Sequence, residues 1–352
     1  MERLRWGVIG AGGIADRRTI PGMMLAENAE LTAVMEVSEE FAGRLRDKYH
    51  AKRAYTSEFD LLADKEVDAV YIASPVVMHA KQAKMAADAG KHILLEKPIA
   101  MTSREGREVL DYCEKKGVQV AAGLMMRFGA HVNNMKKAVA QGKIGQVVSG
   151  YSQFTLWLPD QAGNWRQCKA KSGGGSMMDM GVHTIDLMEF ITGMRITQVA
   201  SLNETITFGY DVEDTSTVLM RLENGAQCVV QTNFNIPDEA ARWRMEFFGT
   251  KGRLMGDTMI GQIDGGTLNA VFLKDNAEYN AAQDHADDEG VWLDGEFGNL
   301  YTKEIESFSN SILKQEPLVV PASDAVHIQE VMEAAYRSTQ EQKIFDIEIH
   351  SL

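Results

Sequence analysis

Residues 4–15 read LRWGVIGAGGIA, and this stretch decides the fold of the first third of the chain. The short apolar run Leu4–Ile9 ends in a glycine loop of pattern GxGxxA, and a helical pattern follows to about residue 24. Strand, glycine turn and helix in this order are the context that a dinucleotide-binding loop requires. The loop by itself is a weak signal, because any tight turn can need glycine, so the neighbouring segments must support it.

The alternation of strands and helices continues to about residue 123. Four further apolar runs predict strands at residues 31–36, 67–74, 92–96 and 118–123. The stretches between them predict helices at about 39–49, 77–89 and 103–116, the last opening with the capping box Thr102-Ser103-Arg104-Glu105. This alternation is typical of a parallel, doubly wound sheet, which we assign to a domain of residues 1–123.

A carboxylate near the end of the second strand provides a second test of the cofactor loop. Glu36 lies about 20 residues beyond the loop, where an acid can accept hydrogen bonds from ribose hydroxyls. Residues 36–40 include no arginine for a 2′-phosphate, which favours NAD over NADP. The loop residues that we expect to bind the pyrophosphate, at the start of a helix, are Gly10, Gly12, Gly13 and Ile14.

Composition narrows the class of protein. A chain of 352 residues favours two domains, and its formal charge of −14 argues against nucleic-acid and anionic membrane partners. The three cysteines form no CxxC pair, which suits a reducing compartment and excludes a cysteine zinc site. With a strand starting by about residue 4 and no apolar run of membrane-spanning length, we expect a cytoplasmic protein.

A second motif, GGGSMMDMGVHTID, occupies residues 173–186. If a helix opens at Ser176, Asp179 and His183 are four residues apart on one face. Ser176 and Asp179 also fit a capping box, so Asp179 could serve the backbone, the chemistry or both. One histidine with Asp179 and Asp186 is a weak zinc set, and the acidic stretch 284–290 lacks EF-hand spacing, so we expect no metal.

These motifs, with several others in a fixed order, resemble the Gfo/Idh/MocA family of NAD(P)-dependent oxidoreductases. Besides the glycine loop and the GGG run, the matching parts are AGKHILLEKP (89–98), MRF (126–128), GKIG (142–145), EDT (213–215) and GTKGRL (249–254). The resemblance extends over nearly the whole chain. It implies an N-terminal Rossmann domain followed by an α+β substrate-binding domain, residues 124–352, with a large, open, mostly antiparallel sheet.

Patterns beyond residue 123 agree with that architecture independently. They predict a strand at 146–155, a hairpin within 215–234 at Asn224-Gly225, and helices at 131–141, 300–314 and 323–340. The last helix is a candidate to pack back toward the first domain. Because an open sheet needs its second face covered, we expect a homodimer or homotetramer formed through this sheet.

The resemblance also implies a catalytic set. The family's EKP lysine, and the aspartate and histidine after the glycines, correspond to Lys97, Asp179 and His183. Alcohol oxidation needs a base, and a histidine, with an ordinary pKa near ~6.5, suits that role. Lys97 would stabilise developing alkoxide charge, and Asp179 could orient the imidazole.

Further site residues follow by analogy with the family. Candidate cofactor contacts are Ser74, Pro75, His79, Glu96, Lys97, Trp165 and Arg166. Candidate substrate contacts are Lys97, Arg127, Trp157, Trp165, Asp179 and His183. Arginines could bind hydroxyls or a carboxylate and tryptophans could stack on a sugar, but packing and salt bridging explain these residues equally well. His79 would support a helix start, and Tyr301 matches a family tyrosine before a late helix.

Two features set this chain apart. The family commonly has Thr-Pro-Asn where this chain has Ser74-Pro75-Val76, so an amide near the cofactor is missing. Methionines cluster at 125–126, 177–178 and 180, where they could fill the core or form an adaptable wall for a bulky substrate.

The sequence therefore predicts an NAD-dependent dehydrogenase acting on a secondary alcohol of a sugar, inositol or glycoside. The alternative is a glycoside-cleaving enzyme that works by transient oxidation and elimination. The complete set of Lys97, Asp179 and His183 argues against a purely regulatory NAD-binding protein.

Overall fold

The computed structural model describes residues 2–274, 281 and 289–349, and the chain divides into two compact units. Unit 1 comprises Met1–Met125, Ala170–Gly173 and Asn299–Glu330, and unit 2 comprises Met126–Lys169, Gly174–Gly298 and Val331–Leu352. The sequence division at residue 123 had placed 299–330 in the second domain. These residues join unit 1 because Ile305 and Phe308 are buried in its core.

Unit 1 is built on a six-stranded parallel sheet of order β3-β2-β1-β4-β5-β6. The strands are β1 (Leu4–Ile9), β2 (Ala29–Met35), β3 (Arg53–Tyr55), β4 (Ala69–Ile72), β5 (His92–Glu96) and β6 (Val120–Gly123). A π-helical turn, Ala15–Thr19, leads into α1 (Ile20–Met23), and the other helices are α2 (Glu39–Tyr49), α3 (Glu58–Leu62), α4 (His79–Asp88), α5 (Ser103–Lys115) and α9 (Leu300–Leu313). The predicted doubly wound sheet is confirmed. The short β3 and α3 were not predicted from the sequence patterns.

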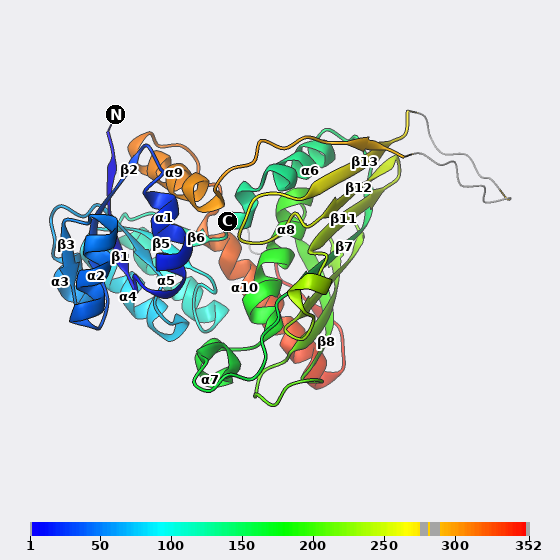
Figure 1. Ribbon diagram of the computed structural model, residues 1–352. Coiled ribbons are helices and arrows are strands. Elements are labelled where there is room, and N and C mark those ends of the chain that lie inside the picture. The colour runs from blue at the N-terminus through cyan, green and yellow to red at the C-terminus, as the bar shows by residue number, and fades with distance from the viewer. Residues whose placement is uncertain (1, 275–280, 282–288, 350–352) are drawn as a thin grey trace. The chain divides into compact units, whose positions relative to one another are not determined.

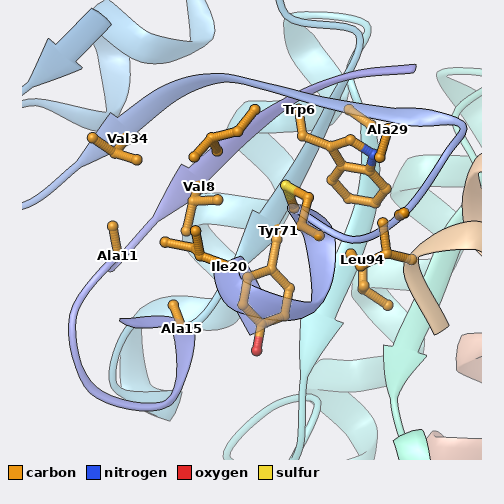
Figure 2. Packing of buried hydrophobic residues seen from close by; sticks show 14 of the residues in the cluster. Trp6, Val8, Ala11, Ala15, Ile20, Ala29, Val34, Tyr71 and Leu94 are labelled. Atoms are coloured by element: carbon orange, nitrogen blue, oxygen red, sulfur yellow. The ribbon is translucent and has the colours of Figure 1, made fainter. Parts of the chain in front are cut away.

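The core of unit 1 lies between β1, β2, β4 and the helices that cover them, and Figure 2 shows its central side chains. Trp6 is fully buried, its ring centroid lies 5.2 Å from that of Phe308, and its indole N–H donates to Ser309 Oγ at 3.2 Å. A large aromatic ring with a satisfied N–H contributes strongly to a core. The contacts of Trp6 with α9 explain why residues so late in the chain belong to this unit.

Unit 2 is built on a nine-stranded sheet of order β14-β13-β12-β11-β7-β10-β9-β8-β15. Its strands are β7 (Val147–Thr155), β8 (Ile196–Glu204), β9 (Thr215–Leu222), β10 (Gln227–Asn233), β11 (Arg244–Gly249), β12 (Gly252–Asp257), β13 (Thr267–Phe272), β14 (Val291–Trp292) and β15 (Phe345–Asp346). Neighbours pair antiparallel except for β7 and β10. The mostly antiparallel sheet is confirmed, and so is the hairpin, whose Gly225 has a φ of 89°.

Helices cover one face of the unit 2 sheet. Here α8 (Val182–Thr192) packs on β7 and β10, and α6 (Ala130–Ala140) packs beside α8 (Figure 1). The short α7 spans Lys169–Ser172. The long α10 (Ala322–Glu341) contributes its residues up to Glu330 to unit 1 and the remainder to unit 2.

Two expectations concern features outside these sheets. Among the described residues, no helix is both long and apolar enough to cross a membrane. The acidic stretch 284–290, where we expect no calcium site, lies outside the described residues up to residue 288.

Candidate functional site

The glycine loop after β1 owes each of its glycines to a different constraint. Gly10 has a φ of +74°, and a Cβ there would lie 2.7 Å from the backbone nitrogen of Ser74. A Cβ on Gly12 would lie 2.8 Å from Glu36 Oε1. Gly13 has a φ of +57° and open space around it, which leaves room beside the loop. The loop therefore passes close to β4 and Glu36 and leads into the π-helical turn at Ala15.

Glu36 lies directly beside this loop. Its Oε1 accepts a hydrogen bond from the Gly12 N–H at 2.7 Å, and its Oε2 accepts one from the Val37 N–H at 3.3 Å. Phe41 of α2 forms an apolar wall, because a Cβ on Gly12 would lie 2.9 Å from its ring. The sequence patterns did not reveal Phe41. A small-residue cradle, a helix start and a carboxylate at the strand end fit a dinucleotide, with Glu36 positioned for ribose hydroxyls.

The loop after β5 carries Lys97, and a chain of hydrogen bonds through the interior of unit 1 ends at the backbone of this residue. Thr19 Oγ1 donates to Tyr71 Oη at 2.9 Å, and the Tyr71 hydroxyl donates to Glu96 Oε1. Glu96 Oε2 then accepts the backbone N–H of Lys97 at 3.1 Å. Burial, and next the charge of Glu96, raise the pKa of Tyr71, so its hydroxyl remains a donor at neutral pH. Glu96 is thus positioned to hold the backbone at Lys97.

His79 is the first residue of α4 and connects two loops of unit 1. Its Nδ1 lies 2.9 Å from the carbonyl oxygen of Pro98, and its Nε2 lies 2.9 Å from that of Ser74. Burial lowers the pKa of this imidazole. These contacts favour a supporting role. Tyr301 lies in the first turn of α9, where burial raises the pKa of its hydroxyl.

The GGG run opens a helix that begins with a π-helical turn, Met177–Gly181, and continues as α8. Of the alternatives for Asp179, the capping box with Ser176 does not form, since Ser176 makes no side-chain cap hydrogen bond. Ser176 is itself helical, its Oγ donates to Thr232 O at 3.1 Å, and its N–H donates to Glu213 O at 3.0 Å. Because Glu213 takes the N–H that a capping-box acid would bind, Asp179 does not have that role. Departures from α-helical geometry of this kind are frequent at functional sites.

Arg166 and Trp165 gather beside Asp179 within unit 2. Arg166 Nε lies 3.4 Å from Asp179 Oδ2, and the Arg166 guanidinium lies 4.6 Å from the centre of the Trp165 ring. His183, four residues beyond Asp179, is in the first turn of α8 and 5% exposed. Trp157 is 42% exposed and contacts Phe208 edge-on, with ring centroids 5.4 Å apart, so much of its surface is accessible for stacking.

Arg127 and Asp186 are both buried and form an ion pair with each other. This geometry favours the salt-bridge interpretation of Arg127 over a substrate contact. Asp186 therefore serves this ion pair. Among the described residues, no group of three or more His, Cys, Asp or Glu is arranged to hold a metal. Burial raises the pKa of Cys113 to about 11 and that of Cys228 to about 12, so neither is a reactive thiolate.

Comparison with known proteins agrees with this arrangement. Residues 4–124 match the model of an oxidoreductase family with an NAD-binding Rossmann fold, and residues 132–255 match the GFO/IDH/MocA C-terminal domain. The chain belongs to the Gfo/Idh/MocA family. This Gfo/Idh/MocA protein is therefore an oxidoreductase of the NAD(P)-dependent dehydrogenase type, as the sequence predicted.

Three relatives illustrate the breadth of the Gfo/Idh/MocA family. The chain is 30% identical to 1,5-anhydro-D-fructose reductase of Ensifer adhaerens over 265 residues, 75% of this chain and 79% of that protein. It is 28% identical to D-xylose 1-dehydrogenase (NADP(+)) 2 of Haloferax volcanii over 337 residues, 96% and 98% of the two chains. The crystal structure of aldose-aldose oxidoreductase from Caulobacter crescentus, complexed with glycerol, has a TM-score of 0.85 and 25% identity, covering 98% of this chain and 100% of that one.

Proposed function

We propose that this protein is an NAD-dependent dehydrogenase that acts on a secondary alcohol of a sugar, inositol or glycoside, or on the matching ketone. The observation that carries the proposal is the cofactor loop, in which the Glu36 carboxylate lies 2.7 Å from the Gly12 nitrogen beside a helix start. The substrate class is supported by the names of relatives, which include a sugar reductase and a xylose dehydrogenase.

Each proposed catalytic residue has its own role in the reaction. A nicotinamide cofactor held by the glycine loop and Glu36 would supply the hydride acceptor or donor for the carbinol carbon. His183 would accept the hydroxyl proton as general base, a role that suits a histidine at neutral pH. Lys97, at the loop that Glu96 holds, would donate a hydrogen bond to the same oxygen and stabilise alkoxide charge. Asp179, with Arg166 beside it, would orient the imidazole, while Trp165 and Trp157 offer faces to the sugar.

The choice of NAD over NADP rests on Glu36. A carboxylate can accept hydrogen bonds from the ribose hydroxyls of NAD, but it repels a 2′-phosphate. Among the relatives, the name of the xylose dehydrogenase specifies NADP(+), so the preference has to be measured for this chain.

The direct experiment incubates the protein with NAD and a panel of sugars, inositols and glucosides, and follows NADH by absorbance. We expect NADH formation with at least one of them, and a loss of kcat of about 10²–10⁴-fold in His183→Ala with NAD affinity unchanged. An absence of NADH with every alcohol, and of NADH consumption with keto-sugars, would contradict the proposal. Release of an aglycone without net NADH would support the glycoside-cleaving alternative instead.

We also propose a cytoplasmic homodimer or homotetramer that assembles through the outer face of the unit 2 sheet. Leu219 of β9 is 53% exposed and lies opposite Val229 of β10, which in turn lies opposite Tyr151 of β7. The three side chains form a partly apolar row across this face. The three cysteines are free, as is usual in a reducing compartment. Light scattering should show a dimer or tetramer that Leu219→Glu dissociates, and a wild-type monomer at micromolar concentration would refute the assembly.

A further inference from the structure

One residue from a distant part of the chain binds three consecutive N–H groups at the start of the helix that carries Asp179 and His183. Glu213, just before β9, accepts the Gly175 N–H on Oε2 at 2.8 Å and the Met177 N–H on Oε1 at 3.0 Å. Its backbone oxygen accepts the Ser176 N–H at 3.0 Å. The first N–H groups of a helix have no partner within the helix, so Glu213 supplies what an N-cap side chain usually supplies.

Tyr336 of α10 holds the Glu213 carboxylate from the other side. Its hydroxyl donates to Glu213 Oε1 at 2.8 Å. Burial, followed by the charge of Glu213, raises the pKa of Tyr336, so this hydroxyl remains a donor at neutral pH. Glu213 is buried, and both of its carboxylate oxygens are occupied, one by Gly175 and the other by Met177 and Tyr336. The carboxylate is therefore fixed in one position against the helix start.

The glycine run exists because of this arrangement. A Cβ on Gly175 would lie 1.9 Å from the backbone oxygen of Glu213, and a Cβ on Gly174 would lie 1.9 Å from the Tyr336 hydroxyl. Of the three glycines, Gly173 has the left-handed backbone, with a φ of +79°. Gly174 and Gly175 are needed for close approach, because any side chain there would push the helix start away from Glu213 and Tyr336.

The neighbouring acid, Asp214, has a different task. Its carboxylate accepts backbone N–H groups from Ile206, Thr207 and Phe208 at 2.8–3.1 Å, in the loop between β8 and β9. The two acids of the EDT motif thus bind two separate segments. Glu213 binds the start of the helix, and Asp214 binds the loop between β8 and β9. Burial raises the pKa of Glu213, and the partial positive charge at the N-terminus of the helix opposes that effect by favouring the charged carboxylate.

We propose that Glu213 and Tyr336 are positioning residues that set the place of Asp179 and His183 through the helix start; this inference rests on the proposed catalytic role of those two residues. Asp179 lies within the π-helical turn that Met177 begins, and His183 lies one turn further. Movement of that turn displaces both side chains together. A displacement of about 1 Å can cost roughly 10²-fold in rate, so a small change at Glu213 has a large kinetic effect.

The test uses two conservative variants of the full chain. Glu213→Gln keeps the shape of the side chain but replaces one acceptor oxygen by an N–H₂ group. The Gly175 N–H or the Met177 N–H then loses its acceptor. We expect kcat to fall about 10- to 100-fold in Glu213→Gln and about 3- to 10-fold in Tyr336→Phe, with the Kd for NAD within about twofold. Ser338→Ala is the matched control, because it removes the α10 hydroxyl oxygen that accepts a buried hydrogen bond from the Ser201 N–H, and it leaves the helix start untouched.

A second readout does not depend on activity. Hydrogen–deuterium exchange should be faster over residues 175–183 in Glu213→Gln than in the wild type, and unchanged there in Ser338→Ala. Unchanged exchange over 175–183, or a loss of kcat no greater than in Ser338→Ala, would overturn the inference. If the wild type oxidises no alcohol, the proposed function fails, whereas the exchange measurement still decides whether Glu213 holds the helix.

Discussion

Arg127 and Asp186 form a two-pronged ion pair in the interior of unit 2: Arg127 Nε lies 2.9 Å from Asp186 Oδ2, and Arg127 Nη2 lies 2.5 Å from Oδ1. Arg127 is 4% exposed and Asp186 is 1% exposed. The guanidinium of Arg127 also lies 4.9 Å from the centre of the Phe190 ring. Asp186 is on α8, three residues beyond His183, so the pair anchors the helix of the candidate site.

Asp186→Ala should lower the free energy of unfolding by about 3–5 kcal/mol, because it removes the carboxylate that compensates the buried charge of Arg127. Urea denaturation at neutral pH measures the change. Asp47→Ala is the control, because it breaks the exposed Arg46–Asp47 pair and should cost no more than about 1 kcal/mol. Equal losses in the two variants would show that the burial of Arg127 and Asp186 has no energetic consequence.

Gly12→Ala should weaken NAD binding by at least about tenfold, because its Cβ would meet the Glu36 carboxylate and the Phe41 ring and displace the loop. Gly43→Ala, in α2 of the same unit, is the matched control, since nothing lies within 4 Å of its Cβ. That variant should keep its affinity for NAD and gain about 0.5–1 kcal/mol of stability. Titration of tryptophan fluorescence gives both Kd values, and a normal Kd in Gly12→Ala would contradict the assignment of the loop.

Glu36→Gln should raise the Kd for NAD by about tenfold or more, since hydrogen bonds to a charged group contribute about 1.5–3 kcal/mol. The same change should narrow the gap between NAD and NADP, because it removes the charge that repels a 2′-phosphate. The ratio of kcat/KM for the two cofactors measures this. A wild-type protein that uses NADP better than NAD would refute our cofactor assignment.

Stability should fall as the pH rises above about 4.3, the ordinary pKa of a glutamate, because of Glu304. Burial, and next the charge of Glu96, raise the pKa of Glu304 well above its usual value. Between the two pKa values, the folded chain keeps a proton on Glu304 that the unfolded chain has released. Each pKa unit by which the folded value exceeds the unfolded value lowers the free energy of unfolding at high pH by about 1.4 kcal/mol. Glu304→Gln should therefore flatten the dependence of Tm on pH between about pH 5 and 8. An unchanged slope would contradict this account of Glu304.

Local pattern alone was enough for most of the elements. The alternation of strands and helices, the glycine loop and the Asn224-Gly225 hairpin depend on residues that are close together in the chain. Glu36 follows the loop at the spacing of the dinucleotide-binding motif. The capping box at Thr102 is another example, because Thr102 Oγ1 accepts the N–H of Glu105, three residues away, at 3.1 Å. Interactions of this range depend little on the rest of the fold, so periodicity and spacing predict them.

The same spacing at Ser176 left a capping role open for Asp179, and contacts with a distant residue exclude it. Ser176 and Asp179 have the capping-box spacing of Thr102 and Glu105. Glu213, just before β9, nevertheless accepts the N–H groups at the start of this helix. The sequence by itself determined the two sheets, the cofactor loop and the candidate catalytic residues. Only the tertiary structure decided which groups hold them in place, namely Glu213 and Tyr336 at the helix start and Asp186 at Arg127. Those partners lie far apart in the chain, and it is the packing of strands and helices that brings their charges and hydrogen-bonding groups together.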